Sequence, residues 1–237
     1  PMAAPHGAES EDERPRASKV KSSDAEMMRS LVIYEDDRII ALNKPAGLAV
    51  QGGTGTTRHI DALSRALVDD TAEKPRLVHR IDRDTAGCLV VARSRSAAQF
   101  LTKMFRERET GKTYWALCKG RPRHHEGKIS NWLVKEQTPD GDRMRIAQHG
   151  EQGADHAVTH YRIIETAGQQ LTWMELQPYT GRTHQLRIHM LDLGCPIIGD
   201  PKYFESDTNW DFPGGIQNRL HLLARRIQIP HPSGGMI

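Results

Sequence analysis

The chain has few cysteines, few aromatic residues and no apolar run long enough to cross a membrane. Its three cysteines, Cys88, Cys118 and Cys195, are far apart and each lies in an apolar stretch. This spacing argues against a disulfide framework and against a cysteine metal site, and it indicates a reduced, cytoplasmic compartment. No secretory leader is recognisable, and acidic residues near the amino end argue against an organelle transit peptide.

The chain also has little net charge, only +3, so its composition alone does not indicate a nucleic-acid-binding protein. The distribution of charge is more informative. Between Leu77 and Arg123 there are eleven Lys and Arg but only four Asp and Glu. A local surplus of positive charge of this kind is what binding to a phosphate backbone requires.

The most informative stretch is residues 77–92. Its last six residues form a short apolar run that is typical of a buried strand. Directly before this run, the segment from Arg80 to Asp84 holds two arginines and two aspartates. Charges this dense beside a core strand favour a functional site or a structural cluster of ion pairs. Nearby arginines favour the ionised form of Asp82, which suits a nucleophile or general base; a plain turn aspartate is the other interpretation.

This stretch resembles the H-R-L-D-R-x-T-S-G signature of the RluA-type pseudouridine synthases, which isomerise uridine in ribosomal and transfer RNA. The chain reads H-R-I-D-R-D-T-A-G and departs from the signature at Ile81 and Ala86. At Ile81 one aliphatic residue stands in place of another, whereas Ala86 lacks the hydroxyl of the serine that is usual in the family. The resemblance covers about residues 31–234. Its further blocks, in the family's order, are Asn43 to Leu48, Lys112 to Leu117 and Thr180 to His189, the last continuing into Gly194 to Tyr203.

The resemblance implies a pseudouridine synthase fold for residues 30–237. This is an α+β domain with a mixed, mainly antiparallel β-sheet, flanked by helices, and a central RNA-binding cleft. The local patterns agree, because strand pairs with two or three inserted helices favour such a sheet. Residues 1–29 are polar and lack a hydrophobic period, and we expect a flexible tail there. The tail has no similarity to the S4-type RNA-binding domain that some family members carry.

Local patterns also place the family blocks on secondary structure. Ser94 is a suitable N-cap for a helix to about Glu109, and Gly111 is expected to close that helix. Residues 112–119 are expected to form a strand that carries Tyr114. Further strands are expected at 127–135, 157–165, 171–177 and 219–229, and a helix capped by Thr183 is expected at 184–193.

The resemblance implies a role for each matching residue. Asp82 would be the essential carboxylate, acting at the ribose either by covalent addition or by removing a proton. Tyr114 would pack against the uracil and help to remove its C5 proton, and Arg182 would pair with Asp82. Arg80 would enter the gap that the everted base leaves. The weaker candidates for contacts with the RNA backbone, or for internal pairing, are Arg83, Lys44 and Arg187.

The implied reaction makes the protein an isomerase, more narrowly an intramolecular transferase. No step of this reaction needs a redox partner or a group donor, so neither a cofactor nor a metal is expected. His184 and His189 do not share a helix face, which also argues against a metal site. The expected partner is RNA, most simply the large-subunit (23S) ribosomal RNA of bacteria, in ribosomal RNA processing and ribosome biogenesis. We expect a monomer that does not contact membranes.

Two other interpretations stay open. A glycoside hydrolase would need a second carboxylate and aromatic platforms for the sugar, but only 5% of the residues are aromatic. A non-catalytic RNA-binding factor in ribosome assembly would be expected to have lost the aspartate or the tyrosine of the synthase, and both are present.

Overall fold

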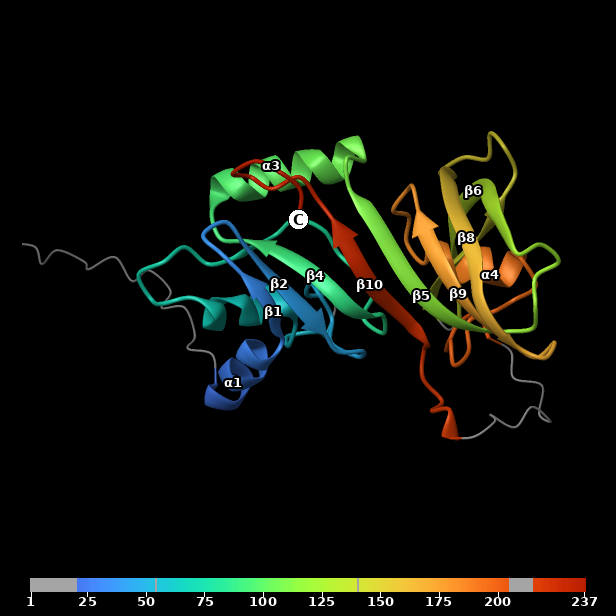
Figure 1. Cartoon of the computed structure of the whole chain (residues 1–237), viewed down its shortest axis with the longest axis horizontal. Coiled ribbons are helices and arrows are strands. Elements are labelled where there is room, and N and C mark those ends of the chain that lie inside the picture. Colours follow the sequence, from blue (N-terminus) through green and yellow to red (C-terminus); the bar gives the residue numbers. More distant parts are fainter. Residues whose placement is uncertain (1–20, 54, 140, 205–214) are drawn as a thin grey trace, which may run out of the picture.

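The computed structural model describes residues 21–53, 55–139, 141–204 and 215–237, and within these residues ten strands form one sheet (Figure 1). The strands are β1 (Val32–Glu35), β2 (Ile39–Lys44), β3 (Arg76–Leu77), β4 (Ala86–Ala92), β5 (Gly111–Lys119), β6 (Glu126–Thr138), β7 (Gly141–Ala147), β8 (Asp155–Ala167), β9 (Leu171–Pro178) and β10 (Leu222–Gln228). The helices are α1 (Ser22–Ser30), α2 (Ile60–Leu63), α3 (Arg95–Glu107) and α4 (Gln185–Asp192), and a 3-10 helix, η1 (Ser64–Leu67), follows α2.

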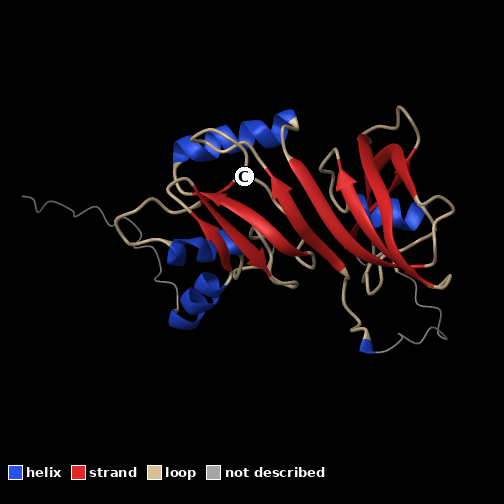
Figure 2. Cartoon of the chain, viewed as in Figure 1, coloured by secondary structure: helices blue, strands red, loops and turns tan. Residues whose placement is uncertain are grey.

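The strand order is β1-β2-β4-β10-β5-β9-β8-β6-β7, and β3 pairs with β4 outside this path. Paired strands run antiparallel except β4 and β10, which run parallel with Leu223 opposite Ala86. β10 follows all other described strands in the chain, yet it lies between β4 and β5 in the middle of the sheet. The predicted mixed, mainly antiparallel sheet flanked by helices is confirmed (Figure 2).

The predicted apolar strand is β4, and both of its faces are buried. Leu89 and Val91 belong to the core cluster that includes residues of α1 and α2, whereas Val90 and Ala92 pack with α3. Figure 1 shows α1 and α3 on opposite faces of this part of the sheet. Every residue from Leu89 to Ala92 is buried, which explains why this part of the sequence is continuously apolar and does not alternate.

The other half of the sheet has a core of its own, which packs against α4. Met174 and Leu176 of β9 lie in one cluster with Leu186 and Met190 of α4. Tyr114 of β5 packs against this cluster and also against the cluster of α1 and α2. The two halves of the sheet therefore meet at a residue that the sequence places in the functional site.

The boundary between the amino-terminal tail and the folded domain differs from the prediction. Residues 1–20 of the predicted tail lie outside the described residues, but residues 22–30 form α1, and Met28 is fully buried in the core. The tail predicted to end at residue 29 is therefore too long. α1 buries only this one residue, so its sequence shows no hydrophobic period from which a helix could be predicted.

Two further local predictions need correction. Helix α3 starts after Ser94, as predicted, because the Ser94 Oγ accepts the N–H of Ala97 at 3.2 Å. It ends at Glu107, its C-cap Arg108 has a φ of +62°, and Gly111 is already the first residue of β5. Strand β7 was not predicted, because the turn residues that precede it favoured a loop.

The close approach of β4 to β10 depends on Gly87, which has a φ of +108°. A Cβ at this position would lie 2.3 Å from the carbonyl oxygen of Ala224 on β10. We expect Gly87→Ala to lower the free energy of unfolding by about 3 kcal/mol, because it combines backbone strain with a clash in the middle of the sheet. Urea unfolding, followed by tryptophan fluorescence, measures this change.

Gly168→Ala is the matched control. Gly168 also has a positive φ, +60°, but nothing lies within 4 Å of the position that its Cβ would occupy. We expect this substitution to cost about 1 kcal/mol, from backbone strain alone. Equal losses for the two variants would show that the contact between β4 and β10 is not tight.

Candidate active site

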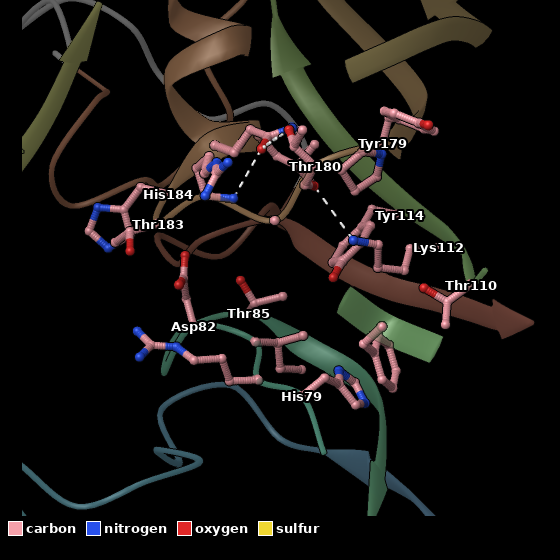
Figure 3. Close-up of a pocket in the computed structure, with 18 of the residues that line it drawn as sticks. His79, Asp82, Thr85, Thr110, Lys112, Tyr114, Tyr179, Thr180, Thr183 and His184 are labelled. Carbon is pink, nitrogen blue, oxygen red and sulfur yellow. Dashed lines mark hydrogen bonds between the residues drawn. The ribbon is translucent and has the colours of Figure 1, made fainter. Parts of the chain in front are cut away.

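An open cavity of about 630 Å³ lies where the two halves of the sheet meet (Figure 3). Its walls come from the loop before β4, the end of α3, the start of β5 and the loop that joins β9 to α4. Asp82, Tyr114 and Arg182 all line it, as do Arg80 and Arg187. Residues from three family blocks that are far apart in the sequence therefore surround one space.

Asp82 lies in the loop before β4 and points into the cavity, with its side chain 23% exposed. The N–H of Thr85 donates to the carbonyl oxygen of Asp82 at 3.2 Å, which closes a turn at this position. Ile81 is buried in the core beneath the loop. The aliphatic exchange at Ile81 thus keeps an apolar anchor next to the carboxylate.

The cationic partner of Asp82 is Arg187 on α4, whose Nη1 lies 3.7 Å from the Asp82 Oδ2. Arg187 is almost completely buried, and its Nε and Nη2 donate to the two carboxylate oxygens of Asp200 at 2.7 and 2.6 Å. Burial alone would lower the pKa of Arg187, but the hydrogen bonds and charge of Asp200 raise it above its usual value. The fork of Arg187 is therefore fixed on Asp200, and its remaining nitrogen faces Asp82.

Two backbone N–H groups hold the carboxylate of Asp200 in place. Its Oδ1 accepts the N–H of Lys202 at 2.9 Å and that of Tyr203 at 3.1 Å. The guanidinium of Arg187 also lies over the ring of Tyr203, 5.0 Å from its centroid. Asp200 and Tyr203 belong to a family block that the sequence shows, but no role was predicted for either residue.

The predicted ion pair between Arg182 and Asp82 is wrong. The Nη1 of Arg182 lies 3.3 Å from the Oδ2 of Asp155, and its Nε donates to the carbonyl oxygen of His156 at 3.2 Å. Arg182 lies in the loop before α4, and this loop directs its side chain to the start of β8. Arg187 lies on the helix itself, and its side chain points back towards the loop of Asp82.

The start of α4 also differs from the prediction. His184, with a φ of +51°, occupies the N-cap position in place of Thr183, and no side chain caps the helix there. Gln185 fixes the loop instead, because its Oε1 accepts the N–H of Arg182 at 3.0 Å and the hydroxyl of Thr180 at 2.6 Å. A buried amide therefore supports the backbone that a capping hydroxyl was expected to support.

Lys44 does not contact RNA, because its side chain is fully buried. Its ammonium donates to the carbonyl oxygens of Pro45, Leu48 and Arg83 at 2.9, 2.7 and 2.8 Å. Burial lowers the pKa of Lys44 to about 8, although the charges of Asp84 and Asp82 act in the opposite direction. Lys44 thus ties the loop after β2 to the backbone beside Asp82, and the predicted backbone contact is wrong. Internal pairing, the alternative for Lys44 and for Arg187, is what both residues show.

Arg80 and Arg83 are the exposed arginines of the loop. Arg83 pairs with Asp84, with 3.1 Å between its Nε and the Asp84 Oδ1. Arg80 is exposed, lines the cavity, and has no ion pair with any described residue. Both side chains are accessible to a polyanion, and their contact with RNA stays a prediction.

The apolar wall of the cavity contains Tyr114 and Phe105. Burial, and then the charge of Asp82, raise the pKa of Tyr114 well above its usual value, so the phenol is neutral near pH 7. The ring of Phe105 stacks on that of His79 at 4.5 Å between centroids. The cavity therefore places a flat aromatic wall across from a carboxylate.

Comparison with known families identifies the family of this chain. The family model described as RNA pseudouridylate synthase matches residues 38–192. The chain belongs to this family. The predicted family relationship is confirmed, and the matched region includes the segments that carry Asp82, Tyr114 and Arg187.

Individual relatives point the same way. The chain is 41% identical to RNA pseudouridine synthase 4, mitochondrial, of Arabidopsis thaliana over 86% of this chain and 52% of that protein. It is 38% identical to ribosomal large subunit pseudouridine synthase C of Rickettsia bellii, over 73% of this chain and 56% of that protein. The chain thus spans little more than half the length of these relatives. Its structure aligns with that of human RNA pseudouridylate synthase domain containing 4, with a TM-score of 0.72, 28% identity, and 90% and 88% of the two chains covered.

The described residues contain no group of three or more His, Cys, Asp and Glu side chains that could hold a metal ion. In the same part of the chain, no helix is both long and apolar enough to span a bilayer.

The ion pair of Arg187 with Asp200 should stabilise the fold as well as the site. We expect Asp200→Asn to lower the free energy of unfolding by about 3 kcal/mol, because it leaves a buried guanidinium without its charged partner. Asp155→Asn is the matched control, since Asp155 pairs with Arg182 while 62% exposed, and it should cost less than about 1 kcal/mol. Urea unfolding of both variants measures the difference, and similar losses would contradict this account.

His79 should make stability depend on pH. Its Nε2 accepts the N–H of Val90 at 2.9 Å, and burial, followed by the charge of Lys112, lowers its pKa to about 3. The unfolded chain, with a pKa near 6.5, binds the proton first as the pH falls. The contribution of His79 is therefore complete above pH 6.5 and is lost between pH 6.5 and about 3, by up to about 1.4 kcal/mol per unit.

Urea unfolding at pH 7, 6 and 5 tests this prediction against His79→Gln, whose amide oxygen can still accept the N–H of Val90. The wild type should lose more stability than the variant as the pH falls. If both proteins show the same slope, His79 is not the group that titrates.

Proposed function

We propose that the chain isomerises uridine to pseudouridine in RNA, with Asp82 as the essential carboxylate. The observation that carries this proposal is the position of one carboxylate at the wall of the cavity, 3.7 Å from Arg187, which Asp200 holds in place. The cavity of about 630 Å³ is within the range of small-molecule sites and is large enough for a nucleoside. The family membership supports the same reaction.

In this reaction the bond from N1 of the uracil to C1′ breaks, and a bond from C5 to C1′ forms. C5 loses a proton and N1 gains one, so atoms and charge balance without a cofactor. The base must leave its stack before either bond can change. Asp82 would act at the ribose, where positive character develops as the base departs, either by adding to the sugar or by taking a ribose proton.

The detached uracil must turn without being lost to water. Tyr114 would pack against the uracil, with Phe105 further along the same apolar wall. Because the pKa of Tyr114 is raised, its phenol is neutral and would not act as a free phenolate base. It would orient the uracil and relay the C5 proton, its oxygen accepting that proton as its own proton passes to the Asp82 carboxylate or to water. Arg80 would fill the gap in the RNA stack, since it is exposed at the cavity and a guanidinium can stack on bases.

For the target we propose large-subunit ribosomal RNA. Relatives from Rickettsia bellii and Haemophilus influenzae are named ribosomal large subunit pseudouridine synthase C. Relatives from Arabidopsis thaliana and Xenopus tropicalis are named mitochondrial, so the cytoplasmic location stays a prediction. The monomeric state also stays a prediction.

The direct test is to incubate transcribed large-subunit ribosomal RNA with the wild type and with Asp82→Asn, and then to map pseudouridine. We expect the variant to lose at least about 1000-fold in rate, because no other carboxylate takes its place, while RNA affinity changes little. Asp84→Asn is the matched control from the same loop, where Asp84 pairs with Arg83, and it should stay within about tenfold of the wild type. RNA binding by the wild type without any pseudouridine would favour the assembly-factor interpretation.

A further inference from the structure

A smaller hollow of about 330 Å³ adjoins the active-site cavity on the side of β6, β8 and β9. It shares Arg108, Tyr179 and Thr180 with the cavity, so the two spaces have a common wall. The remaining lining residues are Lys128, His156, Val158 and His160. The lining thus carries two arginine or lysine side chains and two histidines but no carboxylate. We call this space the flanking hollow.

Tyr179 is the aromatic residue of the flanking hollow, and its side chain is 55% exposed. The backbone of Tyr179 is fixed, because its N–H donates to the carbonyl oxygen of Val158 at 3.0 Å and the next residue, Thr180, is buried. In the view of Figure 3, Tyr179 lies beyond Thr180, on the far side from Asp82. The backbone beneath the ring is therefore fixed, while the ring faces solvent and adds little to the core.

Arg108 covers part of this ring. Its guanidinium lies 4.8 Å from the ring centroid of Tyr179, and its side chain is exposed. The left-handed conformation of Arg108, which residues other than glycine rarely adopt, ends α3 at this point and lets its side chain reach Tyr179. An aromatic ring and a guanidinium are thus presented together at the edge of the cavity.

The strands add one more cation to the same place, Lys128. His156, Val158 and His160 alternate along β8 and so share one face of the sheet. Lys128 of β6 lies directly opposite His160 in the register of the two strands. Among the described residues, Lys128 has no ion pair, so its ammonium is available to an anion.

We propose that the flanking hollow binds a nucleotide next to the uridine that enters the active site. The base of this nucleotide stacks on Tyr179, and its phosphate lies between Arg108 and Lys128. Eversion of one base leaves its neighbours without a stacking partner, and an aromatic ring beside the cavity replaces that partner. The proposal rests on the RNA substrate of the proposed function. It extends that function by a subsite that tolerates any base, because every base has a flat face.

The test uses the full chain and a fluorescein-labelled dodecamer of uridylate, with binding followed by anisotropy at several salt concentrations. We expect Tyr179→Leu to raise the Kd by roughly 5- to 100-fold without changing its salt dependence, because stacking is not ionic. Tyr179→Phe keeps the ring and should stay within about twofold. Lys128→Gln should reduce the slope of log K against log salt by about 0.7, the value for one phosphate contact on a single strand.

Tyr34→Leu is the matched control. Tyr34 is also exposed, at 43%, but it lies on the edge strand β1 and does not line the cavity or the flanking hollow. The Tyr34→Leu variant should bind the oligonucleotide like the wild type. Equal unfolding midpoints for the variants ensure that the comparison concerns binding alone.

The subsite is overturned if Tyr179→Leu binds like the wild type, or if Tyr179→Phe loses as much as Tyr179→Leu. Formation of pseudouridine on transcribed ribosomal RNA is measured separately. The single-turnover rate is measured at several RNA concentrations, and the concentration for half-maximal rate should rise for Tyr179→Leu and stay unchanged for Tyr34→Leu. Activity of the wild type together with an unchanged Kd for Tyr179→Leu would reject the subsite alone. Weakened binding by Tyr179→Leu with an inactive wild type would support the subsite and reject the proposed reaction.

Discussion

The buried pair of Arg187 and Asp200 is the interaction on which the geometry of the site depends. A guanidinium that loses its water must be matched by a carboxylate with good geometry, and Asp200 provides both oxygens at 2.7 and 2.6 Å. Two backbone N–H groups hold Asp200 in turn, so the pair cannot rotate freely. One nitrogen of Arg187 is left to face Asp82. The position of Asp82 is thereby linked to α4 and to the loop after it.

The sheet explains why these segments meet. β5 joins two cores, one packed against α1 and α2 and the other against α4, and Tyr114 contacts both. The cavity opens at this junction, between the loop before β4 and the loop before α4. Each half of the sheet therefore supplies a different part of the site. The carboxylate comes from the first half and its cationic support from the second, which explains why no single sequence block contains the whole arrangement.

Much of the fold and of the candidate site was predictable from the sequence, and each wrong prediction has a physical cause. The apolar run of β4, the cap at Ser94 and the grouping of Asp82 with Tyr114 follow from local patterns or from the family blocks. The partner of Asp82 does not, because Arg182 and Arg187 lie in one block and only the turn at His184 decides which side chain points to the loop. The burial of Lys44 could not be predicted either, since its three carbonyl acceptors come from loops whose paths local patterns do not define.

The place of β10 in the sheet has a consequence for how the protein is made. β4 is complete at residue 92, but the strand that must lie beside it starts at residue 222. At a synthesis rate of roughly 5–20 residues per second, a ribosome needs roughly 6–26 s to make the intervening chain. During that interval the nascent protein presents the free edges of β4 and β5, which are sites of mispairing and aggregation. The strand that joins β4 to β5 is thus made long after β4, so we expect this protein to depend on chaperones early in its life.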